Sequence, residues 1–131
     1  MVVLVDFFNV LLNVEKRELE KDVVNLLIEL REKSVPLYLF TNISSIKLGR
    51  YEEEFHYKQY FDGVVDGDRF LKPNPKAYER LEEETGYRYE DMIFVDDSER
   101  NIEIGESFGI KGIVYKGVED LREKLKGFNL C

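Results

Sequence analysis

The sequence predicts an α/β fold in which a doubly wound parallel sheet is covered by helices on both faces. Short apolar runs with the length of buried strands alternate with longer segments that have helical periodicity. This alternation is typical of parallel strands joined by crossover helices. The chain has 131 residues, so we expect a single domain over residues 1–131 with a sizeable core.

Five apolar runs are the candidate strands, and polar or turn-forming residues bound them. Pro36 opens the second run, and Gly63 and Gly67 frame the third. The first run ends in Asp6, a carboxylate that is costly to bury and is therefore expected in a cleft at the edge of the sheet. We predict strands at residues 2–6, 37–41, 64–65, 92–95 and 110–115, and a strand end followed by a loop at 7–13.

The segments between these strands are the candidate helices. Residues 15–33 carry apolar side chains at helical spacing with charges between them. Ser44 and Ser98 are suitable N-caps, and Asn74 followed by Pro75 is a cap with proline in the first turn. We predict helices at residues 15–33, 46–55, 75–85, 99–108 and 118–125.

The composition is that of a globular protein with a heavily charged surface, 44% apolar and 35% charged. The net charge of −8 argues against nucleic acid or an anionic membrane as the main partner. No apolar run approaches the length of a membrane span, and the short N-terminal run lacks the basic flank of a signal peptide. The only cysteine, Cys131, cannot form an internal disulfide, so we expect a cytoplasmic protein.

Several reactive side chains follow the ends of the predicted strands. Asp6, Thr41 and the pair Asp96-Asp97 each end a strand, and Lys72 lies just beyond the loop after another. The carboxyl ends of parallel strands meet at one edge of a sheet, where ligands bind. We therefore expect these side chains to lie together.

Three carboxylates at one edge repel one another and lose hydration, and a hard cation resolves that conflict. Mg²⁺ prefers oxygen ligands and is often held by one or two carboxylates together with a substrate phosphate. Lys72 would then supply a cation for an anionic substrate, and Thr41 a neutral donor. Taken singly, these residues have structural alternatives: a strand-end cap for Asp6, a solvated lysine, and a helix-cap cluster for the acidic pair.

Four segments resemble the motifs of the haloacid dehalogenase (HAD) superfamily, which consists mostly of magnesium-dependent phosphatases. The resemblance covers nearly the whole chain, and its most specific part is Lys-Pro-x-Pro-x-x-Tyr followed about twenty residues later by a strand and Asp-Asp-Ser-x-x-Asn. The four segments are VDFFNVLL with Asp6, LFTNIS with Thr41 and Asn42, LKPNPKAYE with Lys72, and IFVDDSERNIEIGESFGI with Asp96, Asp97, Ser98 and Asn101.

The resemblance implies a role for each of these residues in a HAD-type three-layer, Rossmann-like fold. Asp6 would be the nucleophile that forms an aspartyl-phosphate, while Thr41 and Lys72 would hold the phosphoryl group. Asn42, Ser98 and Asn101 would lie on the substrate side, with Asn101 fixing the loop that carries the acidic pair. The implied Mg²⁺ ligands are Asp6, Asp96, Asp97 and the backbone carbonyl of Phe8.

The chain departs from the family pattern in two respects. The usual first motif is Asp-x-Asp, in which the second Asp is the general acid and base, but Phe8 stands there. General acid–base help is typically worth about 10²–10⁴-fold, so aryl and acyl phosphates with good leaving groups should be favoured over alkyl phosphates. The usual cap domain is also missing, which predicts an open site.

These observations favour a magnesium-dependent phosphohydrolase that acts on a phosphorylated small molecule or phosphoprotein. The alternative is a catalytically impaired member of the fold that binds phosphate or a partner. A receiver domain is disfavoured because it carries its acidic pair on the first strand, and a dehalogenase because it needs no metal-binding acids. Six aromatic residues are expected mostly in the core, or else as a surface patch for a homodimer: Phe7, Phe8, Phe55, Tyr57, Tyr60 and Phe61.

Overall fold

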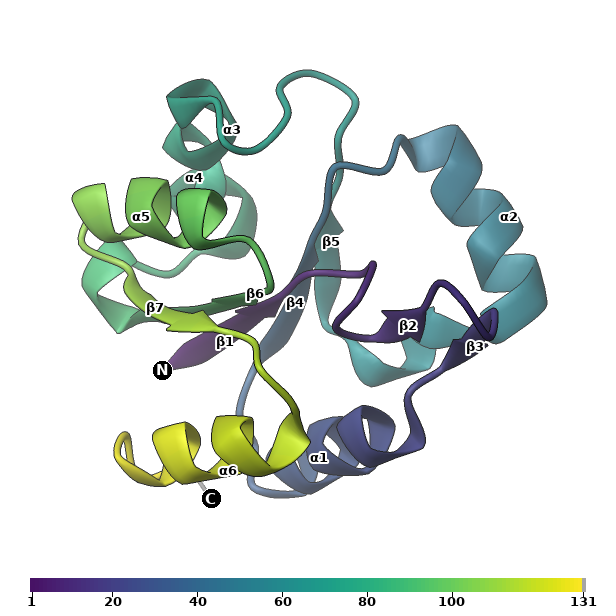
Figure 1. Cartoon of the computed structure of the whole chain (residues 1–131). Helices are drawn as coiled ribbons and strands as arrows, with labels where there is room; N and C mark the ends of the chain where they lie inside the picture. Colours follow the sequence, from purple (N-terminus) through teal and green to yellow (C-terminus); the bar gives the residue numbers. More distant parts are fainter. Residues whose placement is uncertain (131) are drawn as a thin grey trace.

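Five parallel strands form the central sheet of the computed structural model, which describes residues 1–130 (Figure 1). The middle strand, β1 (Val2–Val5), pairs with β4 (Leu37–Phe40) on one side and with β6 (Met92–Asp96) on the other. All four residues of β1 are buried. In spatial order the strands are β5 (Gly63–Val65), β4 (Leu37–Phe40), β1 (Val2–Val5), β6 (Met92–Asp96) and β7 (Lys111–Val114).

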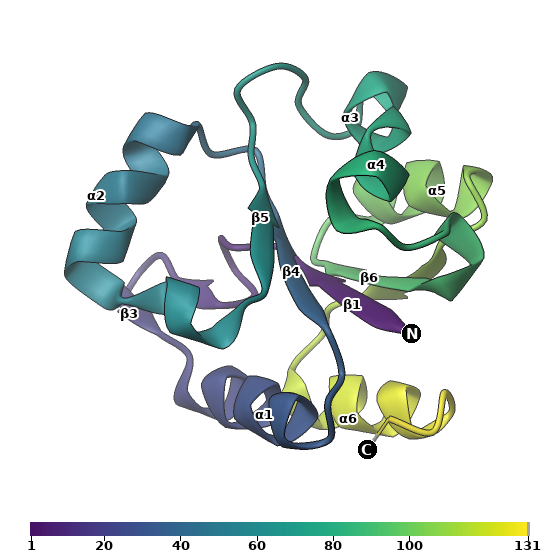
Figure 2. The same ribbon diagram turned by 180° about the vertical axis from the view of Figure 1, so that it is seen from behind.

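Helices cover both faces of this sheet, as Figures 1 and 2 show from opposite sides, and the predicted fold class is confirmed. One face packs on α1 (Lys21–Glu32) and α6 (Val118–Lys126), together with α2 (Ser45–Phe55). The other face packs on α3 (Pro75–Glu79), α4 (Leu81–Thr85) and α5 (Glu99–Ser107). Each face has its own apolar cluster, because alternate residues of β1 point to opposite sides.

The predicted start of the first helix at residue 15 is wrong. A small antiparallel hairpin precedes it, formed by β2 (Leu12–Asn13) and β3 (Glu18–Leu19). The Asn13 side chain accepts a hydrogen bond from the Lys16 N–H at 2.9 Å, and Arg17 takes a left-handed conformation with φ of 54°. These local interactions turn the chain back, so the helix begins only at Lys21.

The remaining predicted elements are present with small changes. The predicted helix at 75–85 is divided at Arg80 into α3 and α4, and two short 3₁₀ turns, η1 (Tyr57–Tyr60) and η2 (Tyr89–Asp91), lie in connections. Ser44 caps α2 by accepting a hydrogen bond from the Lys47 N–H. Among residues 1–130, no helix has both the length and the apolar character needed to cross a membrane. Cys131 lies outside the described residues.

Three of the six aromatic residues belong to the core, three are half-buried at its margin, and their expected contact with a second copy stays a prediction. Phe7 and Tyr57 are fully buried and Phe61 nearly so. Phe8, Phe55 and Tyr60 are partly buried and pack against the same apolar cluster.

Candidate functional site

The predicted site residues meet at the carboxyl edge of the sheet. Asp6 directly follows β1, Thr41 directly follows β4, and Asp96 ends β6. Lys72 lies in the loop after β5, and its side chain donates hydrogen bonds to groups at the ends of β1, β4 and β6. The parallel arrangement is what brings residues separated by up to ninety positions into contact.

Lys72 occupies the centre of the site. Its Nζ lies 3.0 Å from Asp6 Oδ1 and 3.0 Å from Asp96 Oδ2, and it also donates to the Phe40 carbonyl at 2.7 Å. An ammonium group has three protons, so all three are used in these bonds. The side chain is only 1% exposed, which makes this a buried ion pair with two carboxylates. To contact a substrate, Lys72 must exchange one of these bonds for a substrate oxygen.

A third carboxylate, Asp97, lies close to the two that contact this ammonium group. Oxygen atoms of Asp6, Asp96 and Asp97 all lie within 4.8 Å of one another. Asp96 is fully buried, Asp6 is half-buried and Asp97 is exposed. When all are ionised, the carboxylates and Lys72 together carry a net charge of minus two. A divalent, oxygen-seeking cation such as Mg²⁺ fits this donor set.

The surroundings of Asp6 make its carboxyl group less acidic. Burial raises the pKa of Asp6 from 3.8 to about 6, and the Asp96 charge adds to this, against the opposing effect of Lys72. The pKa of Asp97 is also raised, by burial and by its neighbour Asp96. Both shifts arise mainly from burial, and the neighbouring Asp96 adds to each.

Two neutral groups beside the cluster have hydrogen-bonding capacity to spare. The Thr41 hydroxyl is buried and accepts from the Ile43 N–H at 3.1 Å, but its proton has no acceptor among residues 1–130. The Phe8 carbonyl likewise receives no hydrogen bond from the described part of the chain. A buried hydroxyl with an unused proton indicates a ligand, and the Phe8 carbonyl is available as a further oxygen ligand.

The side chain of Asn42 holds the loop that carries Lys72. Its amide donates to the Lys72 carbonyl at 3.1 Å and accepts from the Lys72 N–H at 2.7 Å. Gly67 packs so closely on the Asn42 backbone that a Cβ at this position would overlap it. The amide of Asn42, predicted on the substrate side, is thus engaged with the protein backbone in this structure.

Ser98 and Asn101 support Asp96 in a similar way. The Ser98 N–H donates to Asp96 Oδ1 at 2.9 Å, and Asn101 Nδ2 donates to Asp96 Oδ2 at 3.1 Å. The Ser98 hydroxyl also caps α5 by accepting from the Asn101 N–H at 3.2 Å. The Ser98 backbone and the Asn101 side chain therefore fix the buried carboxylate, and the expected contact of both residues with substrate stays a prediction.

Phe8 is part of an aromatic cluster beside the site. Its half-buried ring meets those of Phe7 and Tyr51 edge to face, with centroids 5.6 Å and 5.7 Å away. Neither partner ring offers a carboxylate that could replace the missing acid. Tyr51 and the Phe40 carbonyl could not be predicted as parts of the site, because both contacts depend on the tertiary fold.

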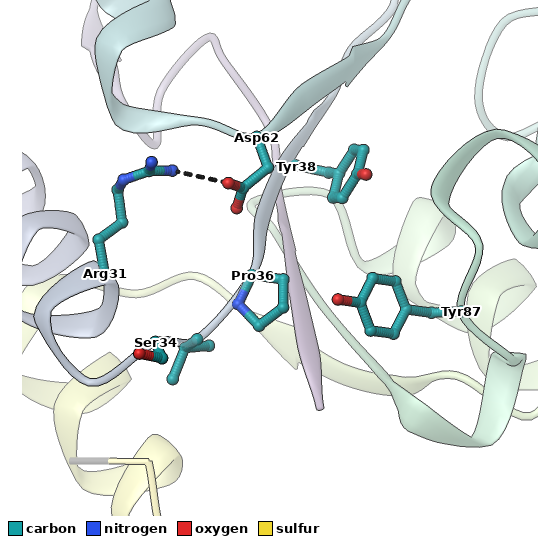
Figure 3. A pocket seen from close by; sticks show the side chains of 7 residues that line it. Arg31, Ser34, Pro36, Tyr38, Asp62 and Tyr87 are labelled. Atoms are coloured by element: carbon teal, nitrogen blue, oxygen red, sulfur yellow. Dashed lines mark ion pairs between the residues drawn. The ribbon is translucent and has the colours of Figure 1, made fainter.

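A hollow of about 320 Å³ lies at the opposite edge of the sheet, where the parallel strands begin (Figure 3). Arg31 and Asp62 form an ion pair of 3.2 Å beside it, and the rings of Tyr38 and Tyr87 line its other side. The acidic cluster lies at the other end of the sheet, so this hollow is separate from the site formed by Lys72.

A family model for haloacid dehalogenase-like hydrolases matches residues 4–115. The chain therefore belongs to this hydrolase family, in agreement with the resemblance of its four motifs. The chain is 26% identical over 109 residues to enolase-phosphatase E1 of Persephonella marina, a match that covers 80% of this chain and 48% of that protein. It thus spans about half the length of this curated relative.

Solved structures agree on the fold. An uncharacterized protein from Corynebacterium glutamicum superposes with a TM-score of 0.80 at 21% identity, covering 98% of this chain and 95% of the other. A wild-type HAD family enzyme from Bacteroides thetaiotaomicron superposes with a TM-score of 0.68 at 25% identity, covering 76% of this chain and 54% of the other. That enzyme was crystallised with magnesium and inorganic phosphate.

Proposed function

We propose that the chain is a Mg²⁺-dependent phosphohydrolase in which Asp6 accepts the phosphoryl group. The observation that carries this proposal is the cluster at the carboxyl edge, where Lys72 lies 3.0 Å from both Asp6 and Asp96 and the nearby Thr41 hydroxyl has an unused proton. Such a site offers a nucleophile, a cation and a neutral donor, which are the parts that phosphoryl transfer requires. The phosphatase relative and the neighbour with magnesium and phosphate support the same class of reaction.

In the first step, an Asp6 carboxylate oxygen attacks phosphorus and the bond to the leaving alcohol breaks. Asp6 must be ionised for this step, and Mg²⁺ bound to its carboxylate would lower the pKa that burial raises. Thr41 donates its free proton to a phosphoryl oxygen, and Lys72 balances the negative charge. Water then attacks the aspartyl-phosphate, which releases inorganic phosphate and regenerates Asp6.

The metal site would be formed by Asp6, Asp96, Asp97 and the Phe8 carbonyl. Bound Mg²⁺ would neutralise phosphoryl oxygens and align the phosphorus with Asp6. Because Phe8 cannot protonate the leaving oxygen, this alcohol must leave as an anion or take its proton from water. Aryl phosphates release a more acidic alcohol than alkyl phosphates, so their hydrolysis depends less on a general acid.

The test is hydrolysis of p-nitrophenyl phosphate with Mg²⁺, after removal of Mg²⁺, and in Asp6→Asn. We expect activity only in the first case. Asp91→Asn is the matched control. It makes the same substitution at an exposed aspartate that precedes β6 and lies outside the acidic cluster at the end of that strand. If wild type and Asp6→Asn are equally inert, a catalytically impaired binding protein is the better description, and release of chloride from 2-chloropropionate would identify a dehalogenase.

A further inference from the structure

A hollow of about 260 Å³ adjoins the proposed phosphoryl site. It is lined by Phe8, Asn42, Ile43, Ser44, Lys47 and Tyr51. Phe8 is two residues from Asp6, and Asn42 is next to Thr41 and bonded to the Lys72 backbone. A phosphate ester held at Asp6 therefore has this hollow beside its leaving group.

The inner wall of the hollow is apolar and fixed in place. Phe8 and Tyr51 meet edge to face with centroids 5.7 Å apart, and the buried Ile43 lies beside them. The fully buried Phe7 ring contacts both, with its centroid 5.6 Å from that of Phe8 and 5.3 Å from that of Tyr51. Such rings favour contact with another aromatic ring over contact with a flexible polar chain.

The outer rim carries positive charge on an otherwise acidic protein. The exposed Lys47 lines this hollow, and the exposed Arg50, three positions further along α2, lines a neighbouring hollow together with Lys47 and Tyr51. Neither side chain has an ion-pair partner among residues 1–130. The neighbouring carboxylate, Glu54, is already paired with Arg17 at 2.9 Å.

We propose that this hollow binds the leaving group of the substrate, an aromatic alcohol that carries a second negatively charged group. The ring would lie against Phe8 and Tyr51, and the second charge would face Lys47 and Arg50. This inference rests on the proposed phosphohydrolase function. It also gives Phe8 a positive role: an aryl alcohol needs little protonation to leave, so the position can hold a ring in place of an acid.

Two aryl phosphates that differ only in charge test the inference. The probes are 3-(4-phosphonooxyphenyl)propanoate and its propanamide, whose phenols are of similar acidity because two methylene groups separate the ring from the varied group. We expect kcat/KM to be about fivefold higher for the carboxylate at low salt, the order of effect that exposed charge pairs give. The advantage should shrink at high salt, which screens exposed charges.

Charge-removing variants assign the preference to this rim. The double variant Lys47→Gln/Arg50→Gln should bring the ratio of the two kcat/KM values close to one. The control is Lys33→Gln/Lys58→Gln, which removes two exposed positive charges that precede the amino ends of β4 and β5 and should keep the ratio. Equal rates for both probes in wild type, with hydrolysis still dependent on Asp6, would overturn the inference and leave the phosphohydrolase standing.

Equilibrium binding separates the two proposals when no hydrolysis is seen. Absence of turnover of both probes would count against the proposed function alone. Calorimetric titration of Asp6→Asn with the same probes then decides the question of the hollow. Tighter binding of the carboxylate, lost in the variant that also carries Lys47→Gln and Arg50→Gln, supports the inference, and equal affinities refute it.

Discussion

Replacement of Lys72 by methionine tests whether this ammonium group balances the buried carboxylates. Methionine keeps an unbranched side chain but removes the charge, so Asp6 and Asp96 lose the partner 3.0 Å from each. Removing one member of a buried ion pair costs about 3–5 kcal/mol, since a charge is left uncompensated. Domains of this size unfold with about 5–15 kcal/mol in total, so the variant should lose a large share of its stability.

The cost should depend on pH. Without Lys72, which lowers the pKa of Asp6, that pKa rises further above about 6, and the carboxyl takes up a proton in mildly acidic solution. Protonation removes part of the repulsion, so the loss of stability should be smaller at acidic pH than at alkaline pH. In the alkaline range we expect the melting temperature to fall by roughly 10–20 °C.

Urea unfolding followed by circular dichroism, with EDTA present, measures both effects. Lys33→Met is the control, because Lys33 is exposed and precedes Ser34, which lines the hollow at the opposite edge of the sheet. A loss below about 1 kcal/mol that does not change with pH would refute the reasoning, because exposed pairs show such values. It would mean that solvent, rather than Lys72, balances the charge.

Four further predictions concern the same edge of the sheet. The pKa of Asp6 is about 6 in the folded protein and 3.8 in the unfolded one, so the folded protein binds more protons between these values and its stability falls as the pH rises through them. Asp6→Asn should lack this loss of stability, and superimposable urea profiles of the two proteins would contradict the prediction. Mg²⁺ at a hundredfold excess over its Kd should stabilise the wild type by about 2.7 kcal/mol in thermal unfolding at neutral pH, and Asp96→Asn should abolish most of this shift. Phe8→Asp should raise kcat/KM for alkyl phosphates more than for aryl phosphates, whereas equal gains would show that Phe8 is not at the general-acid position. Gly67→Ala should lower both the melting temperature and phosphatase activity, because its Cβ would displace the Asn42 backbone, and unchanged values of both would show that this contact can relax freely.

Much of the fold and the position of the site could be predicted from strand ends. A buried apolar run that stops at a carboxylate or hydroxyl identifies both a strand and its functional edge, as Asp6, Thr41 and Asp96 show. The hairpin of residues 12–19 was missed because its strands are only two residues long and Leu19 fits the helical spacing that follows.

The detailed contacts of the site could not be predicted in the same way. Asn42 and Lys72 are thirty positions apart, and nothing local indicates that the asparagine amide binds the lysine backbone. The use of all three Lys72 protons depends on the Phe40 carbonyl, a backbone group that every residue possesses. Such contacts follow from the packing of loops, for which the sequence carries no periodic signal.

The central position of β1 has a consequence for folding. Its pairing with β6 joins Val2 to Met92, so one edge of β1 stays unpaired until a segment about ninety residues later has been made and has docked. Pairings this distant in sequence form slowly, and an open strand edge invites association with other chains during that time. Any fragment that ends before β6 would lack Asp96 as well as this pairing, so the chain gains its sheet centre and its charged cluster in the same late event.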